Sequence, residues 1–129
     1  MNGKSGPRQL EVSRLREFPM NDPSDIPPRY GFDDLKGFID YFAHASLLDE
    51  EDFDPPDFVP VELRWTVADV FQGLELGYRL VSAKTGETSL LQECRRLTKE
   101  ARILFEKHRY EDGRDKLGNA LSLIESVAA

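Results

Sequence analysis

The chain has 129 residues, of which 40% are hydrophobic and 32% charged, and its formal net charge is −7 at pH 7. This length suffices for one domain with one core, and the balance of residue types excludes wholesale disorder. Nucleic acid and anionic membranes both repel an acidic surface. We therefore expect one globular domain whose partner is another protein with a basic surface or segment, with no nucleic acid and no membrane.

The cellular location follows from two further features of the sequence. No apolar run approaches the roughly 20 residues of a membrane span, and the first residues lack the apolar region of a secretory signal. The single cysteine, Cys94, excludes an internal disulfide and favours a reducing compartment. We expect a cytoplasmic protein.

Residues 1–30 are predicted to form a flexible N-terminal arm, because prolines recur there and interrupt any continuous helix. Residues 1–18 contain four basic and two acidic side chains, a net charge of +2 that leaves −9 for the remainder. The apolar residues of this segment fit either a short strand or a helical arm, and they are Leu10, Val12, Leu15 and Phe18. Such an arm either lies back on the acidic body or reaches for a partner.

Four helices are predicted after the arm, because apolar residues that recur three and four positions apart lie on one helix face. Their spans are 33–48, 61–83, 89–108 and 111–127. The second begins near Pro60 or at Thr66, where Asp69 resembles the end of a capping box and a break near Trp65 is expected. Within it, Gly73 and Gly77 thin one face for a neighbouring helix or a ligand chain.

The C-terminal half carries the clearest apolar stripes. The third helix has its stripe at Leu90, Cys94, Leu97, Ala101, Leu104 and His108. The fourth has its stripe at Tyr110, Gly113, Leu117, Ala120 or Leu121, Ile124 and Val127. Two such helices joined by a short turn fold back on each other. The fold class is therefore all-α, a small up-down helical bundle of three to four helices over residues 31–129 with an irregular N-terminal arm.

The C-terminal hairpin resembles a single tetratricopeptide repeat, a motif of about 35 residues. Its small, large and wedge positions match Ala101, Ala120, Leu104, Leu117 and Tyr110. His108 stands where the turn glycine is usual, and Gly113 stands where alanine is usual. The resemblance implies protein binding in the manner of an adaptor or a chaperone.

Residues 49–60 form an acidic loop that contains six carboxylates and no basic residue. Pro55 and Pro56 stop a helix, and repulsion between like charges predicts an extended, solvated segment. The loop departs from a calcium-binding EF-hand, because the central glycine is missing and the prolines stand where that loop turns. Phe53 and Phe58 among these acids suggest a lip that binds a basic, partly apolar peptide.

Catalytic and metal-binding patterns are absent from the sequence. Cys94 and His108 are 14 residues apart on one helix, about 21 Å, so they cannot meet. A pair of Cys94 with His44 stays geometrically open, although a cysteine on an apolar stripe is typical of a core. One cysteine and two distant histidines do not have zinc-site spacing. We expect a protein that is not an enzyme and needs no metal or cofactor.

The sequence thus predicts an adaptor or chaperone-like protein that holds a basic or amphipathic segment of its partner in a groove rimmed by the acidic loop. The candidate partner-binding residues are Asp49, Glu50, Glu51, Asp52, Phe53, Asp54, Asp57, Phe58, Trp65, Phe71 and Tyr78, with Tyr41 as a further aromatic wall. Two alternatives stay open. One is an acidic inhibitor or immunity protein that blocks a toxin or nuclease, and the other is a self-assembling structural subunit such as a homodimer.

Overall fold

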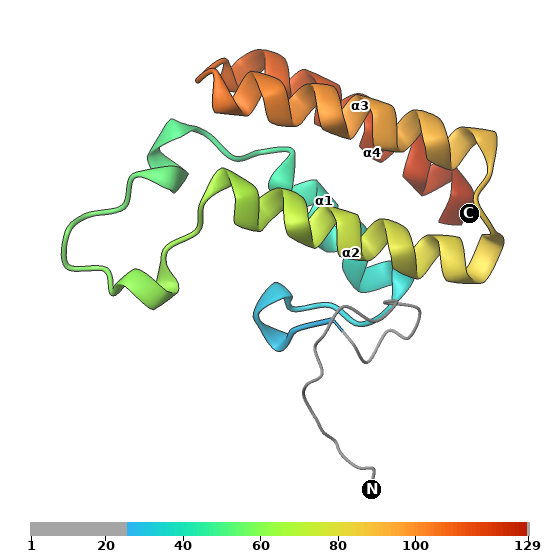
Figure 1. The fold of residues 1–129 in the computed structure, drawn as a ribbon, viewed down its shortest axis with the longest axis horizontal. Coiled ribbons are helices and arrows are strands. Elements are labelled where there is room, and N and C mark those ends of the chain that lie inside the picture. Colours follow the sequence, from blue (N-terminus) through green and yellow to red (C-terminus); the bar gives the residue numbers. More distant parts are fainter. Residues whose placement is uncertain (1–25, 129) are drawn as a thin grey trace, which may run out of the picture.

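Four α-helices make up the body of the protein (Figure 1), for which a computed structural model describes residues 26–128. They are α1 (Leu35–Ala45), α2 (Val67–Thr85), α3 (Ser89–Glu106) and α4 (Tyr110–Ala128). Three short 3₁₀ turns accompany them, namely η2 (Pro28–Tyr30), η3 (Glu50–Phe53) and η4 (Val61–Leu63). Residues 26–128 contain no strand, and the predicted all-α class is confirmed.

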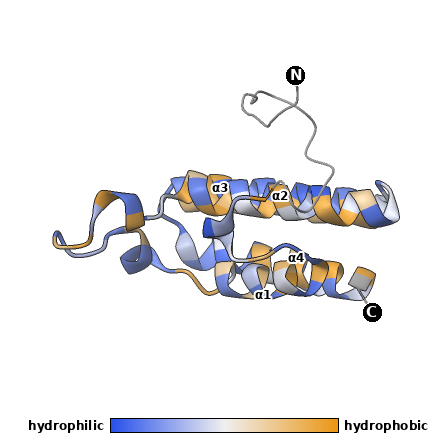
Figure 2. Cartoon of the chain, turned by 90° about the horizontal axis from the view of Figure 1, so that it is seen from below, coloured by the Kyte–Doolittle hydropathy of each residue, from blue (hydrophilic) through white to orange (hydrophobic). Residues whose placement is uncertain are grey.

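The four helices close a ring around one core. α1 contacts α2 and α4, and α3 contacts the same two helices, with the most extensive interface between α3 and α4. Successive helices run in opposite directions (Figure 1), and α2 and α3 form one layer over α1 and α4 (Figure 2). The up-down arrangement follows from short turns, because an apolar stripe is buried only if the next helix folds back onto it.

The start of α2 lies at the second of the two predicted positions. The Thr66 hydroxyl accepts a hydrogen bond from the Asp69 amide at 3.1 Å, and Asp69 Oδ2 accepts one from the Thr66 amide at 2.9 Å. This capping box satisfies amides that the first helical turn leaves without partners. A continuous helix from residue 61 is therefore wrong, because η4 ends before Trp65 and a new helix begins at Val67.

The acidic loop is not fully extended, contrary to prediction. Asp52 Oδ2 accepts a hydrogen bond from the Asp49 amide, and Asp49 Oδ1 accepts one from the Glu50 amide, both at 2.8 Å. These bonds close the 3₁₀ turn η3. Short acidic side chains can bond to nearby backbone amides, and here this local bonding prevails over the repulsion of like charges.

The buried face of α3 agrees with the predicted stripe at Cys94, Leu97 and Ala101 and differs from it at both ends of the helix. Its buried residues are Leu91, Cys94, Leu97, Thr98, Ala101 and Phe105, whereas Leu90 and Leu104 are half-buried. Phe105 is drawn inward because its ring packs edge-on against Phe71 and Tyr110, with ring centres 5.5 and 5.4 Å away. The α4 stripe is confirmed, since Tyr110, Gly113, Leu117, Ala120 and Ile124 are all buried.

His108 is exposed in the turn between α3 and α4, which also corrects its place on the predicted stripe. Its φ of 62° lies in the left-handed region that glycine usually occupies after a helix. The Arg109 amide donates to the Leu104 carbonyl at 2.8 Å and the His108 amide to the Phe105 carbonyl at 3.0 Å. This Schellman motif reverses the chain and sets the hairpin.

Two glycines allow α1 to approach α2 closely. A Cβ atom at Gly77 would overlap the ring of Phe38, and one at Gly73 would overlap Tyr41 and Tyr30. The face of α2 that lacks side chains at Gly73 and Gly77 is therefore covered by α1 and by the segment that precedes α1.

The segment that enters the described fold is packed on the helices. Ile26 and Phe32 are 9% and 7% exposed, and the ring of Tyr30 lies 5.5 Å from Trp65 and 6.1 Å from Tyr41. Residues 26–30 thus belong to the folded body, which corrects the predicted boundary of the arm at residue 30. Residues 1–25 lie outside the described residues, and the predictions for them stay predictions.

Candidate functional site

The structure separates the predicted aromatic site residues into two groups. Phe71 and Tyr78 are 5% and 1% exposed, so they belong to the core and do not line an open groove with Trp65. The Tyr78 hydroxyl donates to the Cys94 carbonyl at 3.2 Å and lies 2.6 Å from the Thr98 hydroxyl. The prediction failed for these two residues because a helical stripe does not reveal which part of it a neighbouring helix covers.

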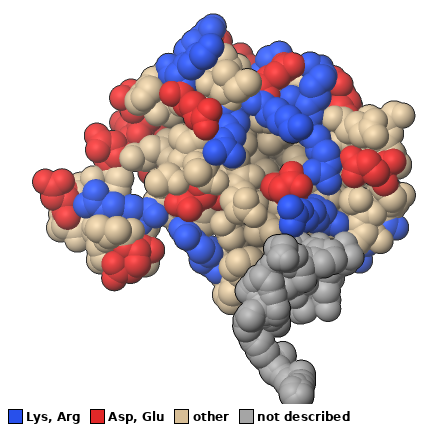
Figure 3. Space-filling view, viewed as in Figure 1, with Lys and Arg blue, Asp and Glu red and all other residues tan. Residues whose placement is uncertain are grey.

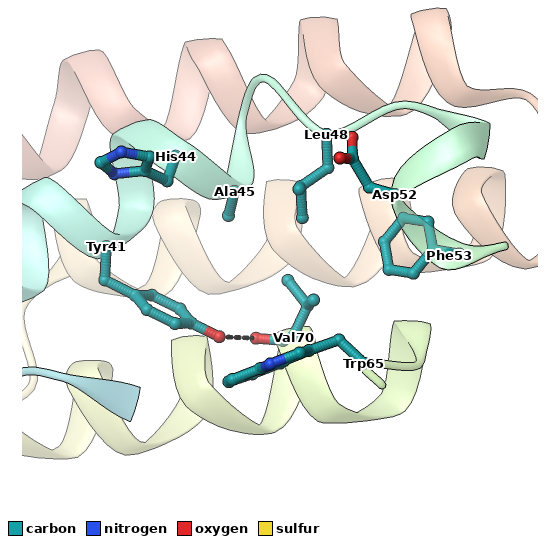
Figure 4. Close-up of a pocket in the computed structure, with 8 residues that line it drawn as sticks. All are labelled: Tyr41, His44, Ala45, Leu48, Asp52, Phe53, Trp65 and Val70. Carbon is teal, nitrogen blue, oxygen red and sulfur yellow. Dashed lines mark hydrogen bonds between the residues drawn. The ribbon is translucent and has the colours of Figure 1, made fainter. Parts of the chain in front are cut away.

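The remaining aromatic residues meet at a pocket of about 300 Å³ between the end of α1, η3 and the start of α2 (Figure 4). Its lining residues are Tyr41, His44, Ala45, Leu48, Asp52, Phe53, Trp65 and Val70. A second pocket of about 370 Å³ shares Tyr41, His44 and Trp65 with the first and extends to Arg29, Tyr30, Gly31, Gly37 and Asp40. These two adjoining pockets are here named the aromatic groove.

The groove walls are mainly apolar and are held in place by specific contacts. The Tyr41 hydroxyl donates to the Val70 carbonyl at 2.8 Å, which fixes this ring across the pocket (Figure 4). Burial raises the pKa of Tyr41 above its usual range, so the hydroxyl stays a donor at neutral pH. The guanidinium of Arg29 lies 4.4 Å from the centre of the Trp65 ring, a cation–π contact. Side chains of Leu48 and Val70 point into the space from opposite sides (Figure 4).

Sequence reasoning missed several groove residues, notably His44, Leu48 and Arg29. His44 Nδ1 lies 2.9 Å from the Asp40 carbonyl oxygen one turn earlier in α1, and its ring is exposed. A signal for Leu48 was present, because this apolar residue ends the span 33–48 that the sequence predicts for the first helix. No local signal marks Arg29, which reaches the groove only through the packing of η2 on Trp65.

Phe53 faces the core and is no free lip of the acidic loop, which corrects a second prediction. Its ring centre lies 6.0 Å from those of Phe105 and Tyr110. It therefore ties η3 to the α3/α4 hairpin while one side of it contributes to the groove wall. Such packing positions the loop relative to the helices.

Phe58 lies near the C-terminal end of the acidic loop, where the apolar side chains are most exposed. Its side chain is 85% exposed, and Val61 and Leu63 are 80% and 65% exposed. We name these three residues the loop tip. The segment that carries them extends away from the helices (Figures 1 and 3). Three apolar side chains exposed so close together are typical of an interaction surface.

The side chain of Arg64 adds three hydrogen bonds to the backbone turns of the segment that carries the loop tip. Its Nε donates to the Val59 carbonyl at 2.9 Å, and its Nη2 donates to the carbonyls of Asp57 at 3.1 Å and Pro56 at 3.3 Å. A planar guanidinium suits this task because its donors form a rigid fork. The apolar residues are thus exposed on a structured loop.

The loop carboxylates differ in their partners. Asp49 Oδ1 lies 3.2 Å from Arg114 Nη1, and the same nitrogen donates to the Leu48 carbonyl at 3.2 Å. The Glu50 amide first, and Arg114 in addition, lower the pKa of Asp49. Within residues 26–128, no ion pair involves the other five loop carboxylates, at Glu50, Glu51, Asp52, Asp54 and Asp57. They leave a negative surface that no cation of the described fold neutralises.

A further pocket, of about 350 Å³, lies between α2 and α3 and contains basic residues. One of them, Arg95, already bonds with Glu75 at 2.9 Å and with Glu87 at 3.0 Å. Arg102 pairs with Glu106 at 2.9 Å. Positive and negative side chains are interspersed on this face (Figure 3), which weakens its attraction for an anion.

Catalytic and metal-binding groups do not converge in the described part of the chain. Cys94 is 0% exposed, its Sγ lies 3.7 Å from the Ala120 carbonyl oxygen, and burial raises its pKa to about 11. Because His44 is exposed while this thiol is enclosed, the Cys94–His44 pair that the sequence left open is not formed. Among residues 26–128, no three His, Cys, Asp or Glu side chains cluster as a metal site requires. No helix in that range has the length and apolarity needed to cross a membrane.

Comparison of the chain with protein-family models, curated proteins and solved structures found no match. The structure shows α3 and α4 as an antiparallel hairpin inside a closed ring of four helices. The resemblance to a tetratricopeptide repeat stays a prediction from the residues, and the class defined by the fold is a small all-α bundle.

Proposed function

We propose that this protein binds another protein, without catalysis, through the loop tip and the aromatic groove. The carrying observation is the ordered exposure of Phe58, Val61 and Leu63 beside five carboxylates that form no ion pair within the described residues. Interfaces combine apolar anchors with a polar rim in this way. A role as adaptor or chaperone fits these features.

The chemistry of the groove and the loop indicates the kind of partner. The walls formed by Tyr41, Leu48 and Trp65 accept apolar side chains, and the neighbouring carboxylates attract lysine and arginine. Charge complementarity of this sort accelerates encounter and selects partners. The partner segment is therefore basic and amphipathic.

The loop tip offers a direct test of this proposal. The parent chain, the double variant Phe58→Ser/Val61→Ser and the control Ile103→Ser would each capture proteins from the native host. Ile103 is a fair control because it is 50% exposed on α3, outside the loop. The parent and the control should capture a basic protein in stoichiometric amount. The affinity of that protein for the double variant should be lower by about tenfold or more. Equal capture by all three chains would refute the role of the loop tip.

A second candidate function is that of an acidic inhibitor, and the projection of the acidic loop favours it. An exposed loop with five unneutralised carboxylates can enter the positively charged active site of a toxin or nuclease. Replacement of Glu50, Glu51, Asp54 and Asp57 by their amides separates the two functions. An electrostatic inhibitor would lose most of its affinity and its salt dependence, whereas a groove-binding adaptor, which keeps its apolar anchors, would lose only a modest part of its affinity. A sedimentation coefficient that rises with concentration would instead favour self-association.

A further inference from the structure

The chain enters the described fold next to the aromatic groove. Ile26 is buried in the core, and three residues later Arg29 lines the groove, followed by Tyr30. The ring of Tyr30 contacts both Tyr41 and Trp65, which line both pockets of the groove. Any segment that precedes Ile26 is therefore tethered close to this site.

The tether is long enough for the arm to reach every part of the groove. Seven residues, 19–25, separate Phe18 from Ile26, and extended chain spans at most about 3.5 Å per residue, or about 25 Å here. The groove follows α1, whose 11 residues rise about 1.5 Å each and so span about 16 Å. Closure of so short a loop costs little entropy compared with the binding of a separate molecule.

The composition of the arm complements the groove. Its apolar residues are Leu10, Val12, Leu15 and Phe18, and its basic residues up to position 18 are Lys4, Arg8, Arg14 and Arg16. The groove presents apolar walls, with Asp40 and Asp52 among its lining residues and the acidic loop beside it, while the charge of its lining residue Arg29 is paired with Asp69 at 3.8 Å. The same chemistry that suits a basic, amphipathic partner is thus present in the chain itself.

We propose that residues 8–18 dock into the aromatic groove of their own chain and cover Trp65 in the free protein. A partner segment then has to displace the arm, so its apparent affinity is reduced by the fraction of molecules in which the groove is open. This competition rests on the proposed function. The docking itself does not, because it requires no partner.

Trp65 reports on the docking, because it is the only tryptophan in the chain and lines both pockets of the groove. The experiment compares acrylamide quenching of its fluorescence in the purified full chain and in a Leu15→Ser/Phe18→Ser variant. Each apolar anchor shifts the docking equilibrium by about tenfold. The quenching constant of the variant should therefore be about twice that of the parent, because the groove is mostly open in the variant and mostly covered in the parent. A control with Gln9→Ser/Asn21→Ser should quench as the parent does.

Equal quenching in the parent, the double variant and the control would overturn the proposal. A second pair, Leu10→Ser/Val12→Ser, should raise quenching as the first pair does, and failure of both pairs would refute docking of this segment. Protection of Trp65 that disappears on dilution would show that the arm of a second copy fills the groove, which also refutes docking within one chain. These readouts use no partner, so they can fail while the proposed function holds. Conversely, docking can be confirmed even if the loop tip captures nothing.

Discussion

Large apolar side chains are buried in the helical body but exposed in the loop at residues 46–66. Phe38 and Leu117 in the body are 0% exposed, whereas Phe58 in the loop is 85% exposed. The body is held by apolar burial within a closed ring of helices. The loop is held by hydrogen bonds to its own backbone and by Arg114 of α4, which bonds to the Leu48 carbonyl and pairs with Asp49. A substitution in the body therefore tests stability, and one at the loop tip tests recognition.

The largest expected loss of stability comes from a substitution at the contact between α1 and α2. Gly77→Ala should lower the free energy of unfolding by about 2–3 kcal/mol, because its Cβ would overlap Phe38 in a filled core. Gly118→Ala in α4 is the matched control, since no side chain or neighbouring element lies within 4 Å of a Cβ there. That control should raise stability by about 0.5–1 kcal/mol through helix propensity alone. Urea unfolding followed by circular dichroism measures both, and similar shifts would contradict the packing argument.

High pH should also weaken the body. Burial raises the pKa of Tyr41 and of Tyr78 in the folded protein, so both phenols stay neutral there while unfolded tyrosine ionises near pH 10. The stabilisation is complete below about pH 10 and is lost as pH rises further, by up to about 1.4 kcal/mol per pH unit for each phenol. Unfolding midpoints at pH 8, 10 and 11 measure this loss, and Tyr41→Phe should reduce the slope. A flat profile above pH 10 would contradict the burial of the two phenols.

The turn between α3 and α4 should gain stability from glycine. His108→Gly should add about 0.5–1 kcal/mol, because a left-handed backbone strains any residue with a Cβ. Lys107→Gly is the control, since its φ of −93° does not favour glycine, and it should add nothing. Thermal unfolding of the two variants measures the difference between these adjacent residues of the same turn. A lower melting temperature for His108→Gly than for the parent would contradict the left-handed conformation.

The smallest effect on global stability is expected in the loop. Arg64→Ala should change the free energy of unfolding by less than about 0.5 kcal/mol, because it removes no buried apolar contact of the body. Proteolytic cleavage within residues 55–63 should nevertheless accelerate about fivefold or more, since the Asp57 and Val59 carbonyls lose their donor and the Pro56 carbonyl keeps only the Val59 amide. Arg64→Lys should be intermediate. Unchanged cleavage in Arg64→Ala would show that other contacts order the loop tip.

Much of the fold follows from short-range patterns in the sequence. Apolar spacing located all four helices, and Thr66, one of the two predicted starts of the second helix, does cap α2. His108 was recognised as the residue at the position of a turn glycine, and it does adopt the left-handed conformation. For the site, the sequence pointed to the acidic loop, Phe58 and Trp65. It did not reveal Arg64 as a residue that orders the loop tip, because that depends on bonds to carbonyls five to eight residues away.

By itself, the sequence determined the four helices and their order, and it offered Thr66 as one of two starts of α2, since these features depend on residues within one or two turns of each other. Only the tertiary structure decided the face that α3 buries. Stripes through Leu90 and Leu104 or through Leu91 and Phe105 are equally periodic, and packing by Phe71 and Tyr110 selects the second. The same applies to Tyr78, enclosed beside Thr98, and to Tyr41 and Trp65, which line the groove. Periodicity shows that a face is apolar, whereas the position of a neighbouring helix determines whether that face becomes core or binding surface.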